Sequence, residues 1–166
     1  MNWQNALAIT HVIGVALGVG GATLNEIFYL KFKTMLGSQV SPSGNTLFAL
    51  IRRTFYAGLA LLIVSGLGFV VLYWFNGVQE FFSNPRLLAK LTIVAILLVG
   101  LVVSRAKQQT FLASAVSLAS WYGALAIGTW RTLDASYGTI MGWYGIAVIA
   151  FIVVLLLIRR WLGVKS

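Results

Sequence analysis

The sequence predicts an all-α, polytopic transmembrane helical bundle of five spans, and three observations support this prediction. The 166 residues are 60% hydrophobic and only 9% charged, whereas soluble domains contain about 25% charged residues. The mean hydropathy of +0.92 is too high for a water-soluble fold of this length, so we expect hydrocarbon to surround most of the chain. Five apolar runs approach the ~20 residues that a spanning helix requires, and clusters of basic residues alternate between them.

The predicted spans fill a single transmembrane domain, residues 1–166, with no long polar segment between them. They lie at about 4–30, 54–76, 86–104, 110–130 and 139–158. Asn84 and Pro85 predict the start of the third span, because Asn caps helix N-termini and Pro is favoured at the first helical position. Asn45 is the predicted cap of a second helix that begins before the membrane. The third span is apolar on every side, and we expect it at the lipid-facing periphery.

The basic residues predict the orientation. Nine of the twelve Lys and Arg residues fall between spans one and two, between spans three and four, or after span five. The alternate segments carry three basic and two acidic residues, a net charge of only +1. By the positive-inside rule, the N-terminus is then outside and the C-terminus is in the cytoplasm, as an odd number of spans requires. The expected location is a cell membrane, of the bacterial plasma membrane type. Because the +9 net charge is explained in this way, we expect no nucleic-acid partner.

The first span contains the only histidine, His11, and the only acid that lies inside an apolar run, Glu26. At 100° per residue, Gly14, Gly18 and Gly21 share a broad helix face with them. Small residues let a neighbouring helix approach closely in lipid, and an ionisable group within a membrane is a functional candidate. We therefore predict a binding or accessory protein that uses a Gly-rich groove of helix 1 around His11. Its partners would be the lipid bilayer and a membrane protein or a second copy of the chain.

A spacing in the same helix carries a resemblance to known proteins. His11 is followed nine and ten residues later by Gly20 and Gly21. This pattern resembles the first helix of the copper-resistance D-like membrane proteins and their uncharacterised bacterial relatives. It is more distantly similar to the small membrane protoporphyrinogen oxidase family, in which a first-helix histidine is thought to bind haem. The resemblance covers one helix, and it implies copper or haem b as a cofactor with His11 as a ligand.

Three further residues are candidates for such a cofactor site. Met141 could add a soft thioether ligand for copper or haem iron. Arg131 could pair with a haem propionate, and Trp121 could stack on a cofactor. The chain would then be a membrane redox protein. With no cysteine in the sequence, thiolate metal sites are excluded.

Both ionisable residues of helix 1 also have structural interpretations. His11 can hydrogen-bond a hydroxyl group across a helix interface, and Glu26 can form an ion pair at the edge of the hydrocarbon. The candidate partners are Ser117 or Thr129 for His11, and Arg52 or Arg53 for Glu26.

The sequence does not favour an enzyme. It has no GxSxG, Walker A, dinucleotide-binding or HExxH motif. His11 and Glu26 are fifteen residues apart, which is about 22 Å along a helix and too far for an acid–base pair. A small transporter is a further alternative.

Overall fold

The computed structural model describes residues 2–35, 42–78, 83–106, 111–130 and 134–162. Within these ranges there is no strand, and the helices are α1 (Trp3–Met35), α2 (Pro42–Phe75), α3 (Pro85–Ala106), α4 (Phe111–Thr129) and α5 (Tyr137–Trp161). Each of the five contains a segment long and apolar enough to cross a membrane. The shortest segments have 19 residues, or about 28 Å of helix, which matches a hydrocarbon core of about 30 Å. The all-α, five-span fold class is confirmed, and the chain is a multi-pass membrane protein.

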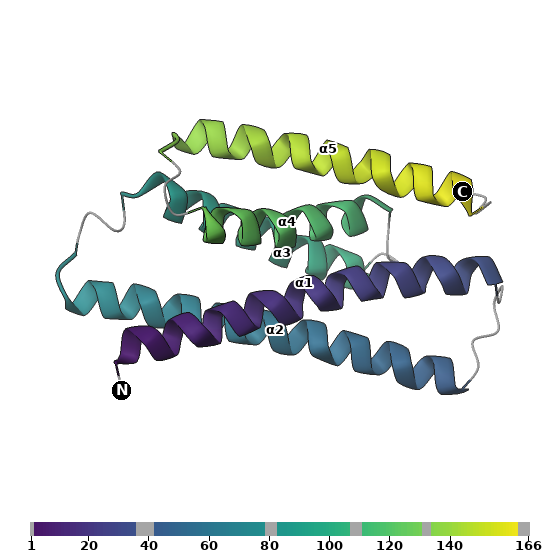
Figure 1. The fold of residues 1–166 in the computed structure, drawn as a ribbon, viewed down its shortest axis with the longest axis horizontal. Coiled ribbons are helices and arrows are strands. Elements are labelled where there is room, and N and C mark those ends of the chain that lie inside the picture. The colour runs from purple at the N-terminus through teal and green to yellow at the C-terminus, as the bar shows by residue number, and fades with distance from the viewer. Residues whose placement is uncertain (1, 36–41, 79–82, 107–110, 131–133, 163–166) are drawn as a thin grey trace.

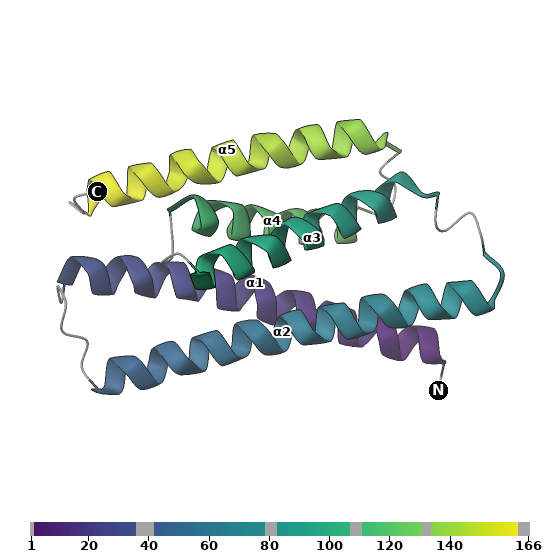
Figure 2. The ribbon, with the colours of Figure 1, turned by 180° about the vertical axis from the view of Figure 1, so that it is seen from behind.

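The helices are arranged as a pair and a trio. α1 and α2 form an antiparallel pair with the most extensive contact in the bundle. α4 packs against α1, and both α3 and α5 pack against α4. The N-terminus lies at one end of the bundle, and the end of α5 lies at the other (Figure 1). Seen from behind, α2 and α5 lie on opposite sides of α3 and α4 (Figure 2). The two termini therefore lie on opposite sides of any membrane that the bundle spans.

α2 is longer than the sequence predicts. It begins at Pro42, twelve residues before the predicted span and three before Asn45, which lies in its first turn instead of capping it. The apolar run is interrupted by Arg52 and Arg53, but the helix continues through them. Gly77 ends the helix with a φ of 67°, which glycine adopts without steric cost, and the two hydrogen bonds of a Schellman motif close the last turn. With 34 residues, α2 is about 51 Å long and extends beyond the hydrocarbon.

Capping residues define the starts of α3 and α5. The Asn84 side-chain oxygen accepts a hydrogen bond from the Arg86 backbone N–H at 2.9 Å, and Pro85 is the first helical residue. The predicted start of the third span is thereby confirmed. Ser136 caps α5 in the same way, accepting from the Thr139 backbone N–H at 3.3 Å.

α3 lies at the periphery, as predicted, and it is with α5 the least buried of the five spans, but one of its faces packs on the bundle. A stripe of Ala89, Ile93 and Leu97, spaced four residues apart, is buried against the other helices. The small side chain of Ala89 packs on Ile140 of α5. The opposite face, with Val99 among others, is exposed and would contact lipid. A helix that is apolar on every side has no polar face to reveal which side packs.

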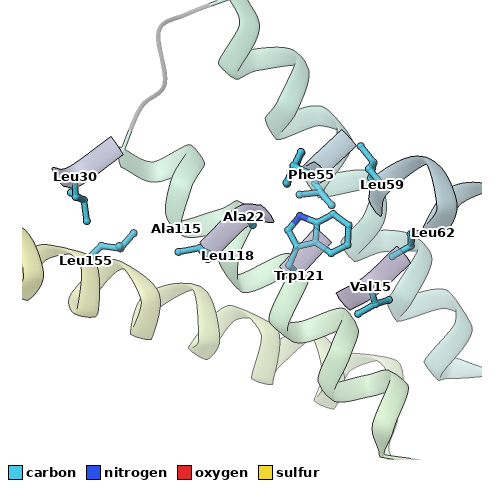
Figure 3. Close-up of a cluster of buried hydrophobic side chains, with 11 residues drawn as sticks. Val15, Ala22, Leu30, Phe55, Leu59, Leu62, Ala115, Leu118, Trp121 and Leu155 are labelled. Carbon is cyan, nitrogen blue, oxygen red and sulfur yellow. The ribbon is translucent and has the colours of Figure 1, made fainter. Parts of the chain in front are cut away.

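The core centres on Trp121 of α4, whose indole ring is completely buried. It lies between α1 and α2, with Val15 on one helix and Leu59 on the other (Figure 3). Phe55 meets the indole edge to face, with ring centroids 5.7 Å apart. A side chain on Gly18 would overlap the indole, so the absence of a Cβ at this position makes room for the ring.

The glycines of helix 1 let α2 approach its backbone. A Cβ on Gly14 would lie 2.7 Å from the backbone nitrogen of Leu62, and one on Gly21 would lie 2.9 Å from the Cα of Phe55. The Gly-rich groove predicted on helix 1 is therefore filled, by α2 over much of its length and by Trp121 at its centre.

Candidate functional site

His11 is held by a hydroxyl group of α2. Its Nδ1 lies 2.9 Å from the Oγ of Ser65, which also lies 2.6 Å from the carbonyl oxygen of Leu61. Because Ser65 donates its one hydroxyl hydrogen to a carbonyl of the preceding turn, it accepts from His11 Nδ1–H. The lone pair of the imidazole is then on Nε2. A cross-helix hydrogen bond is present, but its partner is Ser65 instead of the predicted Ser117 or Thr129 of α4.

The other predicted cofactor residues do not gather around His11. Met141 packs with Ile140 in a cluster between α3 and α5, whereas the hydrogen-bond partner of His11 is on α2. Trp121 has no exposed ring face on which a cofactor could stack. Arg131 lies outside the described residues. Among the residues that are described, no group of three or more His, Cys, Asp or Glu side chains is placed to hold a metal ion.

Glu26 lies near the other end of α1 and is only 4% exposed. Its Oε1 is 3.8 Å from Nη2 of Arg159, whose guanidinium also lies 4.5 Å from the centre of the Phe111 ring. The ion pair thus forms with Arg159 of α5, which corrects the prediction of Arg52 or Arg53. Arg52 lines a cavity next to Glu26, and Arg53 lies outside it on an exposed part of α2.

This cavity has a volume of about 400 Å³ and lies among α1, α2, α3 and α4. Polar side chains form much of its wall: Asn25, Glu26, Arg52, Tyr56, Ser114 and Ser117. Its volume is within the range of about 300–1,000 Å³ found for small-molecule sites. We call it the Glu26 cavity.

Two buried polar atoms of the Glu26 cavity, Glu26 Oε1 and Ser114 Oγ, have no hydrogen-bond partner. Ser65 and Ser120 instead donate to backbone carbonyls one turn earlier. Arg159, the ion-pair partner of Glu26, also has a buried Nε–H without an acceptor. Buried polar atoms in folded proteins are nearly always hydrogen-bonded, so a cavity lined by two residues whose buried polar atoms lack such bonds is a candidate binding site.

A second, apolar space adjoins this cavity. It has a volume of about 480 Å³ and lies between α1, α4 and α5. Its lining is Thr23, Glu26, Ile27, Leu30, Leu118, Tyr122, Phe151, Val154, Leu155, Ile158 and Leu162. We call it the α1–α5 groove. The hydroxyl groups of Thr23 and Tyr122 lie 3.1 Å apart and hydrogen-bond each other within it.

Neither space is predicted by the sequence. Ser114 and Ser117 are three residues apart on α4, and Asn25 precedes Glu26 on α1, so the polar residues themselves were visible in the sequence. Nothing in the sequence says that α4 places its serines opposite Glu26.

Comparison of the chain with protein-family models, with curated proteins and with solved structures finds no match in any of the three. The likeness of the first helix to the copper-resistance D-like proteins therefore stays a prediction. The fold and the cavity define a five-helix membrane protein with a polar site beside a buried glutamate.

Proposed function

We propose that this chain is a non-enzymatic membrane protein that binds a ligand in the Glu26 cavity. The observation that supports the proposal is that two residues lining one cavity, Glu26 and Ser114, have buried polar atoms without hydrogen-bond partners. Glu26 Oε1 has only the ion pair with Arg159 at 3.8 Å. Leaving such an atom without a partner costs about 1–3 kcal/mol, and a bound polar group removes that cost. The predicted binding region thus stays on helix 1 but moves from His11 to the opposite end.

The proposal requires that the cavity be open to ligands from outside the protein. Water molecules occupy about 30 Å³ each, so a sealed cavity of this size could instead hold trapped water that partners the same atoms. Accessibility distinguishes a binding site from a sealed, hydrated core.

The absence of cysteine from the chain allows a direct test. Single cysteines are introduced as Ser114→Cys and Ser117→Cys, and the purified protein in phosphatidylcholine vesicles is treated with N-ethylmaleimide. Ala119→Cys is the control, because Ala119 is completely buried in the same helix and lines neither the Glu26 cavity nor the α1–α5 groove. We expect the two cavity cysteines to react and the control to stay unmodified. If neither cavity cysteine reacts, the cavity is sealed and the proposed function is wrong.

We also propose that the N-terminus is outside and the C-terminus is in the cytoplasm of a bacterial plasma membrane. The uneven distribution of Lys and Arg supports this orientation. The Glu26 cavity would then lie in the cytoplasmic half of the membrane, because it adjoins the end of the bundle where Arg159 is found.

A second candidate function is favoured by the tautomer of His11. The bond from Nδ1–H to Ser65 leaves Nε2 as a possible ligand for haem iron or copper, and a metal-binding histidine is commonly held by an acceptor in this way. An absorption spectrum with metal analysis of the purified protein tests it. A Soret band that His11→Ala removes would support haem binding. A colourless, copper-free preparation after growth with added iron and copper would contradict both haem binding and copper binding.

A further inference from the structure

The Glu26 cavity and the α1–α5 groove are adjoining spaces of opposite character. Glu26 and Leu118 line both of them, so these two side chains lie between the two spaces. The cavity presents guanidinium, amide, carboxylate and hydroxyl groups, whereas the groove is lined almost entirely by aliphatic and aromatic side chains. Two adjacent spaces of this kind suit an amphiphile, with its polar head in the cavity and its chain in the groove. This inference rests on the proposed function, because it names the ligand of the same cavity.

The charges of the cavity favour an anionic head. Glu26 is compensated by Arg159 at 3.8 Å, and the two together contribute no net charge. Arg52 also lines the cavity and forms no ion pair with the described residues, so the site carries an excess positive charge. A cationic head would have to displace Arg159 from Glu26 and tolerate Arg52, whereas a phosphate would pair with Arg52.

The unused hydrogen-bonding groups favour the same head. The Ser114 hydroxyl is a buried donor without an acceptor, and the Arg52 guanidinium lines the same cavity. Phosphate oxygens accept hydrogen bonds from hydroxyl and guanidinium groups, and charge-assisted bonds of this kind are about twice as strong as neutral ones. Glu26 Oε1 is an acceptor, which suits a hydroxyl group next to the phosphate.

The groove has the length of one lipid leaflet. Its lining on α5 runs from Phe151 to Leu162, about 16 Å along the helix axis, and half of the hydrocarbon core is about 15 Å thick. An acyl chain in the groove leaves one hydrocarbon environment for another, so the groove provides the path of the chain without discriminating between lipids by their chains. Selectivity among lipids must therefore come from the head in the cavity.

We propose that the Glu26 cavity and the α1–α5 groove together bind one anionic phospholipid, with its phosphate at Arg52 and Ser114 and one acyl chain along α5. A phosphatidylglycerol head has the required chemistry, since it combines a phosphate with hydroxyl groups. A zwitterionic phosphatidylcholine head has neither a net negative charge nor a hydroxyl group.

The test measures protection of Ser117→Cys from N-ethylmaleimide in two kinds of vesicle, one of phosphatidylcholine alone and one of equal parts phosphatidylcholine and phosphatidylglycerol. Ser117 lines the cavity but is not one of the residues assigned to the phosphate. Anionic lipid also changes the surface potential, so each rate is divided by that of Asn45→Cys, an exposed site near the start of α2. We expect phosphatidylglycerol to slow the relative rate severalfold. With Arg52→Gln added, about ten times more phosphatidylglycerol should be needed for the same protection. A tenfold change is what the loss of one charge-assisted hydrogen bond produces. Arg53→Gln, the matched neighbour outside the cavity, should not weaken it.

The outcomes separate this inference from the proposed function. If Ser117→Cys reacts in every vesicle at the same relative rate, or if Arg52→Gln and Arg53→Gln behave alike, the lipid inference is overturned while the open cavity stands. If inorganic phosphate in phosphatidylcholine vesicles protects equally well, the site takes phosphate without a chain, and the lipid inference is again overturned. If Ser117→Cys does not react in any vesicle, Ser114→Cys decides whether the cavity is sealed. A sealed cavity contradicts both proposals.

Discussion

The indole ring of Trp121 lies against the backbone of Gly18, in space that any side chain at that position would fill. The two residues come from α1 and α4, more than one hundred positions apart, and they join the helix pair to the helix trio. Their contact fixes how closely α4 approaches α1, and so it also sets the position of Ser114, which faces the Glu26 cavity from the same helix.

Gly18→Ala should destabilise the bundle. A methyl group there overlaps the indole, and overpacking a filled core costs about 1–3 kcal/mol. Thermal unfolding in detergent micelles measures the effect. Gly20→Ala is the control, because a Cβ on Gly20 has no atom within 4 Å to meet, and it should unfold like the wild type. Trp121→Leu should remove most of the penalty of Gly18→Ala, and additive effects of the two changes would contradict the assigned contact.

Glu26→Gln should destabilise the protein more than Arg52→Gln does. The first change leaves the guanidinium of Arg159, whose side chain is 16% exposed, without its counter-ion. Breaking one side of a fully buried pair costs about 3–5 kcal/mol, so the loss here should lie below that range. Arg52 is exposed and forms no ion pair with the described residues, so its substitution should hardly change stability. Unfolding of the double variant Glu26→Gln/Arg159→Gln checks the pairing. Its loss should be smaller than the sum of the two single losses, and a simple sum would show that the two residues are not coupled.

The ion pair also shows what the sequence could and could not predict. Apolar length alone predicts the five spans, because hydrocarbon thickness sets a minimum helix length. Depth in the membrane predicts that Glu26 needs a cation near that end of the bundle, but Arg52, Arg53 and Arg159 all satisfy that condition. Which of them is the partner depends on the packing of α5 beside α1, and no local pattern encodes this packing.

The cavity could not be predicted for a related reason. Ser65 of α2 and Ser120 of α4 each donate the hydroxyl hydrogen to a backbone carbonyl, whereas the Ser114 hydroxyl has no acceptor. All three residues are serines, so residue type alone does not distinguish them.

The start of α2 differs from the predicted start for a local reason. Hydropathy falls at Arg52 and Arg53, but the helix continues through them. Hydropathy therefore marks where the membrane begins and leaves the ends of the helices undetermined.

His11→Asn should be tolerated better than His11→Gln. The amide nitrogen of Asn can occupy the position of Nδ1 and donate to Ser65, whereas that of Gln extends toward the position of Nε2. A net hydrogen bond is worth about 1 kcal/mol, so we expect a difference of this order in unfolding free energy. Ser65→Ala should remove the difference between the two variants. If Gln is tolerated as well as Asn in the presence of Ser65, the bond from Nδ1 does not stabilise the fold.

The proposed orientation can be measured with the same cysteine-free background. Asp134→Cys and Asn45→Cys place exposed thiols at opposite ends of the bundle. With a membrane-impermeant sulfonated maleimide on intact cells, we expect Asp134→Cys to be labelled at once and Asn45→Cys only after permeabilisation, since the basic loops face the cytoplasm. The reverse pattern would place the C-terminus outside and make the sequence-based orientation wrong.

Filling the α1–α5 groove should abolish lipid protection without unfolding the protein. Val154 lines the groove and Val153 does not, although their side chains are 47% and 48% exposed. Adjacent residues of a helix point about 100° apart, so Val154→Trp projects into the path of the acyl chain while Val153→Trp projects elsewhere. In the Ser117→Cys background, phosphatidylglycerol should still slow the reaction of the thiol with N-ethylmaleimide when Val153→Trp is added, and it should lose that effect when Val154→Trp is added. A phosphate at Arg52 does not itself require the groove to be empty. If phosphatidylglycerol still protects the thiol with Val154→Trp, the head binds in the cavity and its chain lies outside the groove.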